Sequence, residues 1–323
     1  WKLSMPMPTA MEHLAFTQCH HRVKRKFTST ISQSPKINLE QTNISMKKIQ
    51  HLIFSVLLIS NLPAADWPTW GGDATRNMVS LETGLDFDFE PGEMNDDESV
   101  DMSTTKNIKW VAKLGSQAYG NVTIANGRVF AGTNNESPRD TGKKGDRGVV
   151  MCFNEKSGEI EWQLVIPKLG AGKVSDWEYI GVCSSPAIEG NRVYVVTNKC
   201  EVVCLDIEGF KNGNDGPFMD EANYVKPKGT QDSLNEKLDA DIIWMYDMRD
   251  QLGVFPHNVT SSSPLIIGDS IFIATSNGVD WSHTNIPSPL SPSWIALDKN
   301  TGELIGEDGS GASAGALHAA WSS

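Results

Sequence analysis

Residues 264–277 read Pro264-Leu-Ile-Ile-Gly268-Asp-Ser-Ile-Phe272-Ile-Ala-Thr-Ser-Asn277, two apolar runs on either side of a Gly-Asp turn. Two earlier stretches share this pattern: Val122-Thr-Ile-Ala-Asn-Gly127-Arg-Val-Phe130-Ala-Gly-Thr-Asn134 and Pro186-Ala-Ile-Glu-Gly190-Asn-Arg-Val-Tyr194-Val-Val-Thr-Asn198. A Gly beside Asn or Asp between two such runs is typical of a β-hairpin, because these residues accept the positive φ of a tight turn. The sequence therefore predicts three β-hairpins of one kind.

A second shared element follows each hairpin. Its three copies are Trp294-Ile-Ala-Leu-Asp298-Lys-Asn-Thr-Gly302-Glu-Leu-Ile, Val149-Val-Met-Cys-Phe-Asn154-Glu-Lys-Ser-Gly158-Glu-Ile-Glu-Trp162, and Glu201-Val-Val-Cys-Leu-Asp206-Ile-Glu-Gly209 with a closing strand delayed to Ile242-Ile-Trp244. The Asp or Asn hydrogen-bonds to the turn that it opens, and the Gly closes that turn with a positive φ. Four strands in each recurring unit, with a Trp in the outer strand, predict the blades of a β-propeller. About three to four blades are present, and the extra length between them lies in insertions.

These repeats resemble those of the pyrroloquinoline-quinone (PQQ)-like β-propeller superfamily. The resemblance rests on the Ala-Leu-Asp-x-x-Thr-Gly element, on the outer-strand Trp, and on the opening Asp66-Trp-Pro-Thr-Trp70-Gly-Gly-Asp73-Ala-Thr-Arg76-Asn, which is similar to that of many secreted members. The runs at residues 200–210, 214–218, 253–258 and 275–280 are similar to those of an uncharacterised branch of this superfamily from environmental bacteria. The resemblance implies an all-β fold of four-stranded antiparallel blades over residues 66–323. Because a propeller needs at least about four blades to close, we expect an incomplete, C-terminally truncated propeller.

The first 65 residues differ in charge from the rest, with 8 of the 28 basic residues but only 2 of the 40 acidic ones. Met46-Lys47-Lys48, an apolar run over 49–62 and the small residues Pro63-Ala64-Ala65 have the order of a secretory signal peptide. The run is shorter than the ~20 residues of a membrane span. We therefore predict a signal peptide at 46–65 and a spurious or disordered upstream segment at 1–45. The mature chain is expected to be secreted or periplasmic, without a transmembrane helix.

The composition narrows the classes of partner. The net charge is −12, and an acidic surface repels the phosphate backbone, which argues against a nucleic-acid-binding protein. A hydrophobic content of 39%, with 10 Trp, argues against disorder over most of the chain. We expect the partner to be a protein, a small molecule or a glycan.

Four cysteines lie in the repeats: Cys152, Cys183, Cys200 and Cys204. Cys152 and Cys204 occupy the slot that Ala296 fills in the third repeat, so we expect buried thiols there. Cys200 and Cys204 stand about 13 Å apart on one strand, which is too far for a disulfide. Cys183 and Cys200 are left as a pair that an oxidising compartment would allow to bond. The spacing matches no metal site.

Ligand specificity is expected in the insertions, because loops on a rigid scaffold carry function. These insertions are residues 135–147, 163–184, 210–240 and 278–293. We predict a polar and aromatic ligand face made of Asp176, Trp177, His257, Asn258, Asp280, Trp281 and His283. The alternative is that these loops are solvated and that their aromatic residues pack on the blades.

The resemblance leaves the function open between two classes. Quinoprotein dehydrogenases of the superfamily stack PQQ on a Trp, cap it with a disulfide between adjacent cysteines and hold Ca²⁺ with Glu, Asn and Asp. This sequence contains no adjacent cysteine pair, and no particular residue in it is assigned as a Ca²⁺ ligand or as the catalytic base.

The leading hypothesis is therefore an exported, non-catalytic propeller that binds a protein or another ligand. A PQQ- and calcium-dependent dehydrogenase of alcohols or sugars is the alternative, which the 66–77 opening supports because it also resembles enzyme members. A carbohydrate-binding propeller, with Trp177 and Trp281 as platforms, is the third hypothesis.

Overall fold

The computed structural model describes residues 13–16 and 65–321. The chain divides into two compact units, a large one made of 1–18, 66–81 and 88–323 and a small one made of 19–65 and 82–87. The described part of the small unit has no helix or strand, and its Ala65 backbone N–H donates to Glu82 Oε1 at 2.7 Å. Apart from residue 65, the predicted signal peptide lies outside the described residues, as does the upstream segment apart from 13–16.

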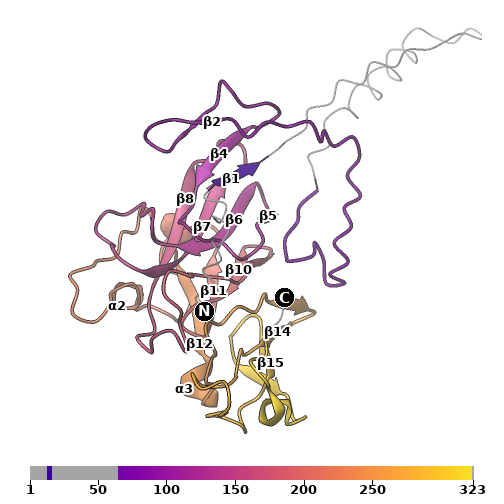
Figure 1. The fold of residues 1–323 in the computed structure, drawn as a ribbon, viewed down its shortest axis with the longest axis vertical. Helices are drawn as coiled ribbons and strands as arrows, with labels where there is room; N and C mark the ends of the chain where they lie inside the picture. The colour runs from indigo at the N-terminus through magenta and orange to yellow at the C-terminus, as the bar shows by residue number, and fades with distance from the viewer. Residues whose placement is uncertain (1–12, 17–64, 322–323) are drawn as a thin grey trace, which may run out of the picture. The chain divides into compact units, whose positions relative to one another are not determined.

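Three four-stranded antiparallel sheets follow one another along the large unit (Figure 1). The first consists of β5 (Thr123–Ala125), β6 (Arg128–Asn134), β7 (Arg147–Asn154) and β8 (Ile160–Pro167). The second consists of β9 (Ala187–Glu189), β10 (Arg192–Val196), β11 (Glu201–Asp206) and β12 (Ile242–Asp247). The third consists of β13 (Leu265–Ile267), β14 (Ser270–Ala274), β15 (Trp294–Asp298) and β16 (Leu304–Glu307). The predicted all-β class and its four-stranded antiparallel blades are confirmed, and so is the delayed closing strand of the second unit.

Short elements complete the described chain. β4 (Trp110–Lys113) pairs antiparallel with β1 (His13–Phe16), and β2 (Glu93–Met94) pairs with β3 (Val100–Asp101). The helices are η1 (Gly209–Asn212), α2 (Glu221–Tyr224), α3 (Met248–Leu252) and η2 (Ala312–Gly315). Within the described ranges, no helix has the length and apolar character that crossing a bilayer requires.

A tryptophan of one strand or sheet packs on the turn glycine of the sheet that follows it in the sequence. A Cβ on Gly158 would lie 2.5 Å from the indole of Trp110, and a Cβ on Gly302 would lie 2.5 Å from the indole of Trp244. Both glycines have the positive φ that the sequence predicts, 75° and 74°. The indole Nε1–H of each Trp donates to a backbone carbonyl of the turn, at 2.9 Å for Trp110 and 3.2 Å for Trp244. Glycine is therefore required at these turns both for its conformation and for the close approach of the indole.

The strand register shows which side chains are equivalent in the three sheets. Cys152 lies opposite Trp162 in the first sheet, whereas Ala296 lies opposite Gly306 in the third. The third sheet therefore lacks the outer-strand Trp, and its Phe272 is 43% exposed. Buried apolar clusters lie between β4 and the first sheet, between the first and second sheets, and between the second and third. The successive sheets thus stack through apolar faces, as the blades of a propeller do.

A cluster of carboxylates at the start of β12 predicts a pH-dependent stability. Burial, together with the nearby carboxylates of Glu221, Asp206 and Asp215, raises the pKa of Asp241 to about 6, although the backbone N–H of Asp215 opposes this shift. Between about pH 4 and 6 the folded state therefore binds more protons than the unfolded state, so the free energy of unfolding falls as the pH rises through this window.

We expect Asp241→Asn to remove most of this dependence. The melting temperature of the variant should decline less than that of the wild type between pH 4.5 and 7, as measured by scanning calorimetry. Parallel curves for the two proteins would contradict this assignment.

Candidate functional site

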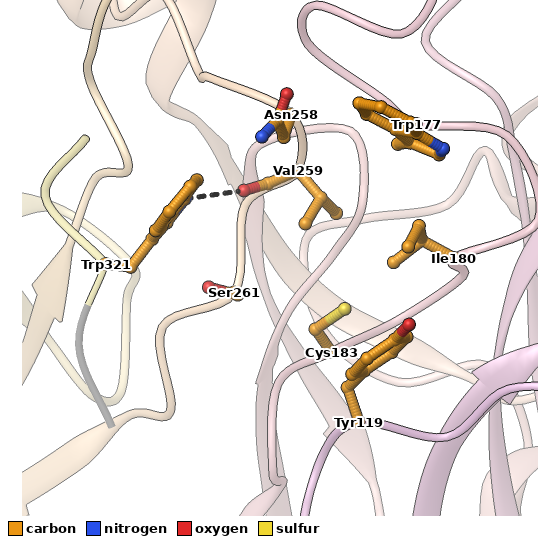
Figure 2. Close-up of a pocket in the computed structure, with 8 residues that line it drawn as sticks. All are labelled: Tyr119, Trp177, Ile180, Cys183, Asn258, Val259, Ser261 and Trp321. Carbon is orange, nitrogen blue, oxygen red and sulfur yellow. Dashed lines mark hydrogen bonds between the residues drawn. The ribbon is translucent and has the colours of Figure 1, made fainter. Parts of the chain in front are cut away.

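An open pocket with a volume of about 390 Å³ lies where four loop segments of the large unit meet (Figure 2). The segments are the approach to β5, the connection from β8 to β9, the connection from α3 to β13, and the C-terminal stretch after η2. The lining residues are Tyr119, Trp177, Ile180, Cys183, Asn258, Val259, Ser261 and Trp321.

Hydrogen bonds hold the walls of this pocket to one another. The backbone N–H of Trp177 donates to the carbonyl of Asn258 at 2.7 Å, and the N–H of Asn258 donates to the carbonyl of Val174 at 2.6 Å. On the other side, the indole Nε1–H of Trp321 donates to the carbonyl of Val259 at 3.1 Å, as Figure 2 shows. These hydrogen bonds join segments that are distant in the sequence and hold them around one pocket.

The pocket is aromatic, with a single amide oxygen that has no partner. Tyr119, Trp177 and Trp321 are all partly exposed. Asn258 has a φ of +61°, a conformation that Asn adopts more readily than most residues. Its Oδ1 is buried and has no hydrogen-bond partner. A buried acceptor without a partner is costly.

The pocket contains no ionised group among its described lining residues. Burial raises the pKa of the Cys183 thiol to about 12, so it is protonated at neutral pH and is a poor nucleophile. All four cysteines of the repeats are free thiols, Cys183 and Cys200 included. The lining therefore has the chemistry for stacking and hydrogen bonding.

Trp177 and Asn258, two of the seven predicted ligand residues, line the pocket. The ring centroid of Trp281 lies 6.2 Å from that of Trp177, which makes Trp281 an extension of the aromatic wall. A positive charge lies beside the same wall, since Lys173 Nζ is 5.4 Å from the Trp177 ring centroid.

Both predicted aspartates are engaged in local structure and lie outside the pocket lining. Asp176 is buried, forms an ion pair with Lys168, and accepts hydrogen bonds from the Leu169 N–H at 2.7 Å and from Asn198 Nδ2 at 3.1 Å. Burial raises the pKa of Asp176, although Lys168 opposes this shift.

Asp280 caps its own loop. It accepts hydrogen bonds from the Ser282 N–H at 2.9 Å and from Asn285 Nδ2 at 3.2 Å. The Ser282 hydroxyl also donates to Asp280, at 2.5 Å, and this bond, followed by the one from Asn285 Nδ2, lowers the pKa of Asp280. The two carboxylates thus order the loops around the pocket and do not face into it.

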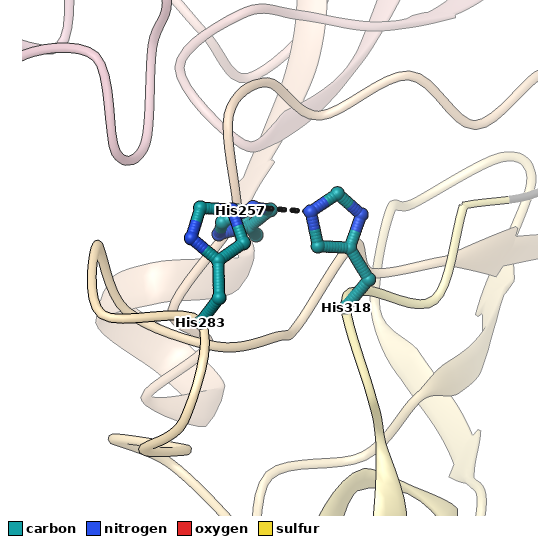
Figure 3. A group of neighbouring side chains, drawn as sticks. All are labelled: His257, His283 and His318. Atoms are coloured by element: carbon teal, nitrogen blue, oxygen red, sulfur yellow. Dashed lines mark hydrogen bonds between the residues drawn. The ribbon is translucent and has the colours of Figure 1, made fainter.

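The two predicted histidines come together behind the pocket. The ring centroids of His257 and His283 are 4.9 Å apart, and His318 lies beside both (Figure 3). Trp321 separates this group from the pocket, with its ring centroid 4.8 Å from that of His318. Burial lowers the pKa of His257, and the neighbouring His318 and His283 lower it further, while a hydrogen bond to the Val279 carbonyl opposes them.

The predicted ligand face lacks Tyr119, Trp321 and His318. Tyr119 precedes the first hairpin, and the other two lie near the last described residue. No local pattern joins such distant positions, because their proximity depends on how the blades stack.

The chain is similar to several known proteins. A family model described as outer membrane protein assembly factor BamB matches residues 97–209. The solved structure of BamB from Moraxella catarrhalis is similar to this chain at 14% identity and a TM-score of 0.32, covering 62% of this chain and 39% of that one. Among curated proteins, no match to the chain was found.

Two solved dehydrogenases are also similar. Quinohemoprotein alcohol dehydrogenase from Comamonas testosteroni matches at 12% identity and a TM-score of 0.42, with 77% of this chain and 28% of that chain covered. Quinohemoprotein alcohol dehydrogenase ADHIIG from Pseudomonas putida HK5 matches at 12% identity and a TM-score of 0.39, with 75% and 26% covered. This chain thus spans between about a quarter and two fifths of the length of these three structures.

Proposed function

Because this chain is built of PQQ-like β-propeller repeats, we propose that it is an exported, non-catalytic propeller that binds a small ring-shaped ligand in the aromatic pocket, with a glycan as the ligand class. The observation that carries the proposal is that three partly exposed aromatic side chains, Tyr119, Trp177 and Trp321, line one open pocket. The C–H faces of a sugar stack on Trp177, Tyr119 and Trp321, and its hydroxyl groups can hydrogen-bond to the polar groups of the lining. The pocket volume of about 390 Å³ lies within the range of about 300–1,000 Å³ that small-molecule sites span.

The same lining does not fit PQQ and Ca²⁺, which the superfamily implies. PQQ carries three carboxylates, and Ca²⁺ prefers carboxylate and carbonyl oxygens. The described residues that line the pocket include no Arg or Lys to pair with the carboxylates and no Asp or Glu to hold the ion. The two lysines at Trp177 both have carboxylate partners: Lys173, which lies over the ring, forms an ion pair with Glu178 at 3.4 Å, and Lys168 forms one with Asp176. The pocket therefore does not suit a quinone with its calcium ion.

A fluorescence titration of the full chain tests the proposal. Neutral oligosaccharides (cellobiose, maltose and chitobiose) should change the tryptophan emission in a saturable way, because three of the wall or neighbouring residues are Trp. Trp177→Ala should weaken the binding of the responding sugar at least tenfold, since truncation of an aromatic anchor at a site costs about 2 kcal/mol.

The matched control is Trp294→Ala, which removes a half-exposed Trp of β15 that is not part of the pocket. This control should bind the sugar as the wild type does. A parallel titration with PQQ, with and without Ca²⁺, tests the dehydrogenase alternative. Saturable quenching by PQQ that requires Ca²⁺ and is lost in Trp177→Ala would replace our proposal with that alternative.

A further inference from the structure

Three histidines from three separate segments converge next to the aromatic pocket (Figure 3). His257 follows α3, His283 lies in the connection from β14 to β15, and His318 lies in the C-terminal stretch after η2. One candidate ligand nitrogen from each lies within 4.8 Å of the other two. In the described part of the chain, this is the group of titratable side chains whose geometry suits a metal ion.

Hydrogen bonds to backbone carbonyls orient two of the rings. His257 Nδ1 is 2.7 Å from the carbonyl oxygen of Val279, and His283 Nδ1 is 3.1 Å from the carbonyl oxygen of Trp281. A carbonyl only accepts, so each Nδ1 carries the proton and each Nε2 keeps a free lone pair. Metal-binding histidines are held in this way, with one ring nitrogen on a carbonyl and the other on the metal.

The third ring faces the first through its Nε2. His257 Nε2 and His318 Nε2 are 2.9 Å apart. Because the first of these atoms is unprotonated, the pair is stabilised either by a proton of His318 or by a cation that both lone pairs coordinate. Two ligands of a tetrahedral ion with metal–nitrogen bonds of about 2.0–2.1 Å stand about 3.3 Å apart, so the pair needs only a small adjustment to hold an ion.

The surroundings leave one side of the group open. His257 is buried, His318 is half-buried and His283 is exposed, so the group has a path to solvent and room for a water molecule as a fourth ligand. Trp321 closes the opposite side, with ring centroids 6.0 Å from His257 and 4.8 Å from His318. The nearby carboxylate of Asp280 already accepts hydrogen bonds from Ser282 and Asn285.

We infer that His257, His283 and His318 form a binding site for a divalent transition-metal ion, with Zn²⁺ as the ion of choice. Three neutral imidazoles suit Zn²⁺ and Cu²⁺, whereas Ca²⁺ and Mg²⁺ require oxygen ligands. The bound ion would join three segments that are far apart in the sequence. It lies behind Trp321, so the site is distinct from the aromatic pocket and does not depend on the function proposed for that pocket.

Isothermal titration of the metal-free full chain with Zn²⁺ tests this site. Cys19, His20 and His21 lie outside the described residues and are themselves potential ligands, so the parent protein for the titration carries Cys19→Ser, His20→Ala and His21→Ala. The parent should bind one equivalent of Zn²⁺ and should not respond to Ca²⁺. His283→Ala and His318→Ala should each weaken Zn²⁺ binding by about 10- to 100-fold or more, since loss of even an outer partner has an effect of this size.

Two further measurements separate a lost ligand from a lost fold. The thermal midpoints of His283→Ala and His318→Ala without Zn²⁺ should match that of the parent, because neither side chain is buried, and Zn²⁺ should raise only the parent's midpoint. Co²⁺ should give the parent a visible absorption band that both variants lose. Trp177→Ala in the same parent should keep full Zn²⁺ binding. A parent that binds no Zn²⁺, or variants that bind it as tightly as the parent, would overturn the assignment.

Discussion

Replacing Trp162 with Ala should lower the free energy of unfolding by about 3–5 kcal/mol. The indole is 1% exposed, its ring centroid is 5.9 Å from that of Phe130, and its Nε1–H donates to the carbonyl of Ile207 at 2.8 Å. It belongs to the apolar cluster between the first and second sheets. Its truncation therefore leaves a cavity between two blades and a buried carbonyl without a donor. Urea denaturation followed by circular dichroism measures the loss.

Two companion variants give this prediction its controls. Trp294→Ala removes a Trp that is 48% exposed and should cost no more than about 1 kcal/mol. Trp162→Phe keeps most of the buried ring but loses the hydrogen bond, so its cost should lie between the other two. Equal losses for Trp162→Ala and Trp294→Ala would show that blade stacking does not depend on the buried indole.

Replacing Lys143 with Ala should cost about 3–5 kcal/mol at neutral pH. The ammonium group is 1% exposed and forms ion pairs with Asp239, whose side chain is fully buried, and with Asp140 at 3.2 Å. Without Lys143, the carboxylate of Asp239 remains buried beside no cation. Burial already raises the pKa of Asp239 against the effect of Lys143, and loss of the ammonium raises it further.

The sign of the pH effect follows from linkage. In the Lys143→Ala variant the folded state binds a proton at Asp239 more tightly than the unfolded state does, so stability falls as the pH rises above about 4. The deficit relative to the wild type should therefore be larger at pH 7 than at pH 4.5. Lys144→Ala is the matched control, because that neighbouring side chain is exposed, and it should change stability by less than about 0.5 kcal/mol.

A double variant separates the buried charge from the lost packing. Lys143→Met combined with Asp239→Leu removes both charges and should recover a large part of the stability that Lys143→Ala loses. If the double variant is as unstable as the single one, the cost comes from packing and not from an unpaired carboxylate.

Much of the fold could be read from local residue patterns. Turn chemistry at Gly158 and Gly302 predicts the positive φ that both glycines adopt, and the alternation of apolar runs predicts the strands on either side. Cys152 and Cys204 were expected in a small-residue slot, and both are buried free thiols opposite a Trp of the next strand. These features depend on interactions within one unit or between adjacent strands, which are short in sequence.

The site could be read only in part. Trp177 and Asn258 stand out as polar or aromatic residues in loops, and both line the pocket. Asp176 looked equally suitable, but its place beside Lys168 and Asn198 inside the protein depends on how the loop folds back on the second sheet. A residue type in a loop indicates chemistry, whereas the direction of the side chain depends on contacts that the loop makes elsewhere.

Repeat spacing, turn residues and apolar alternation are local properties, and so the sequence alone predicts the four-stranded blades. The aromatic pocket and the three-histidine group are tertiary in origin. Tyr119 and Trp321, which line the same pocket, are 202 positions apart in the sequence, and His257 and His318, which are in contact, are 61 positions apart. Only the stacking of successive sheets brings such residues together. The burial of apolar faces drives this stacking, and it is non-directional, so no local sequence pattern records which loops become neighbours at the edge of the sheets.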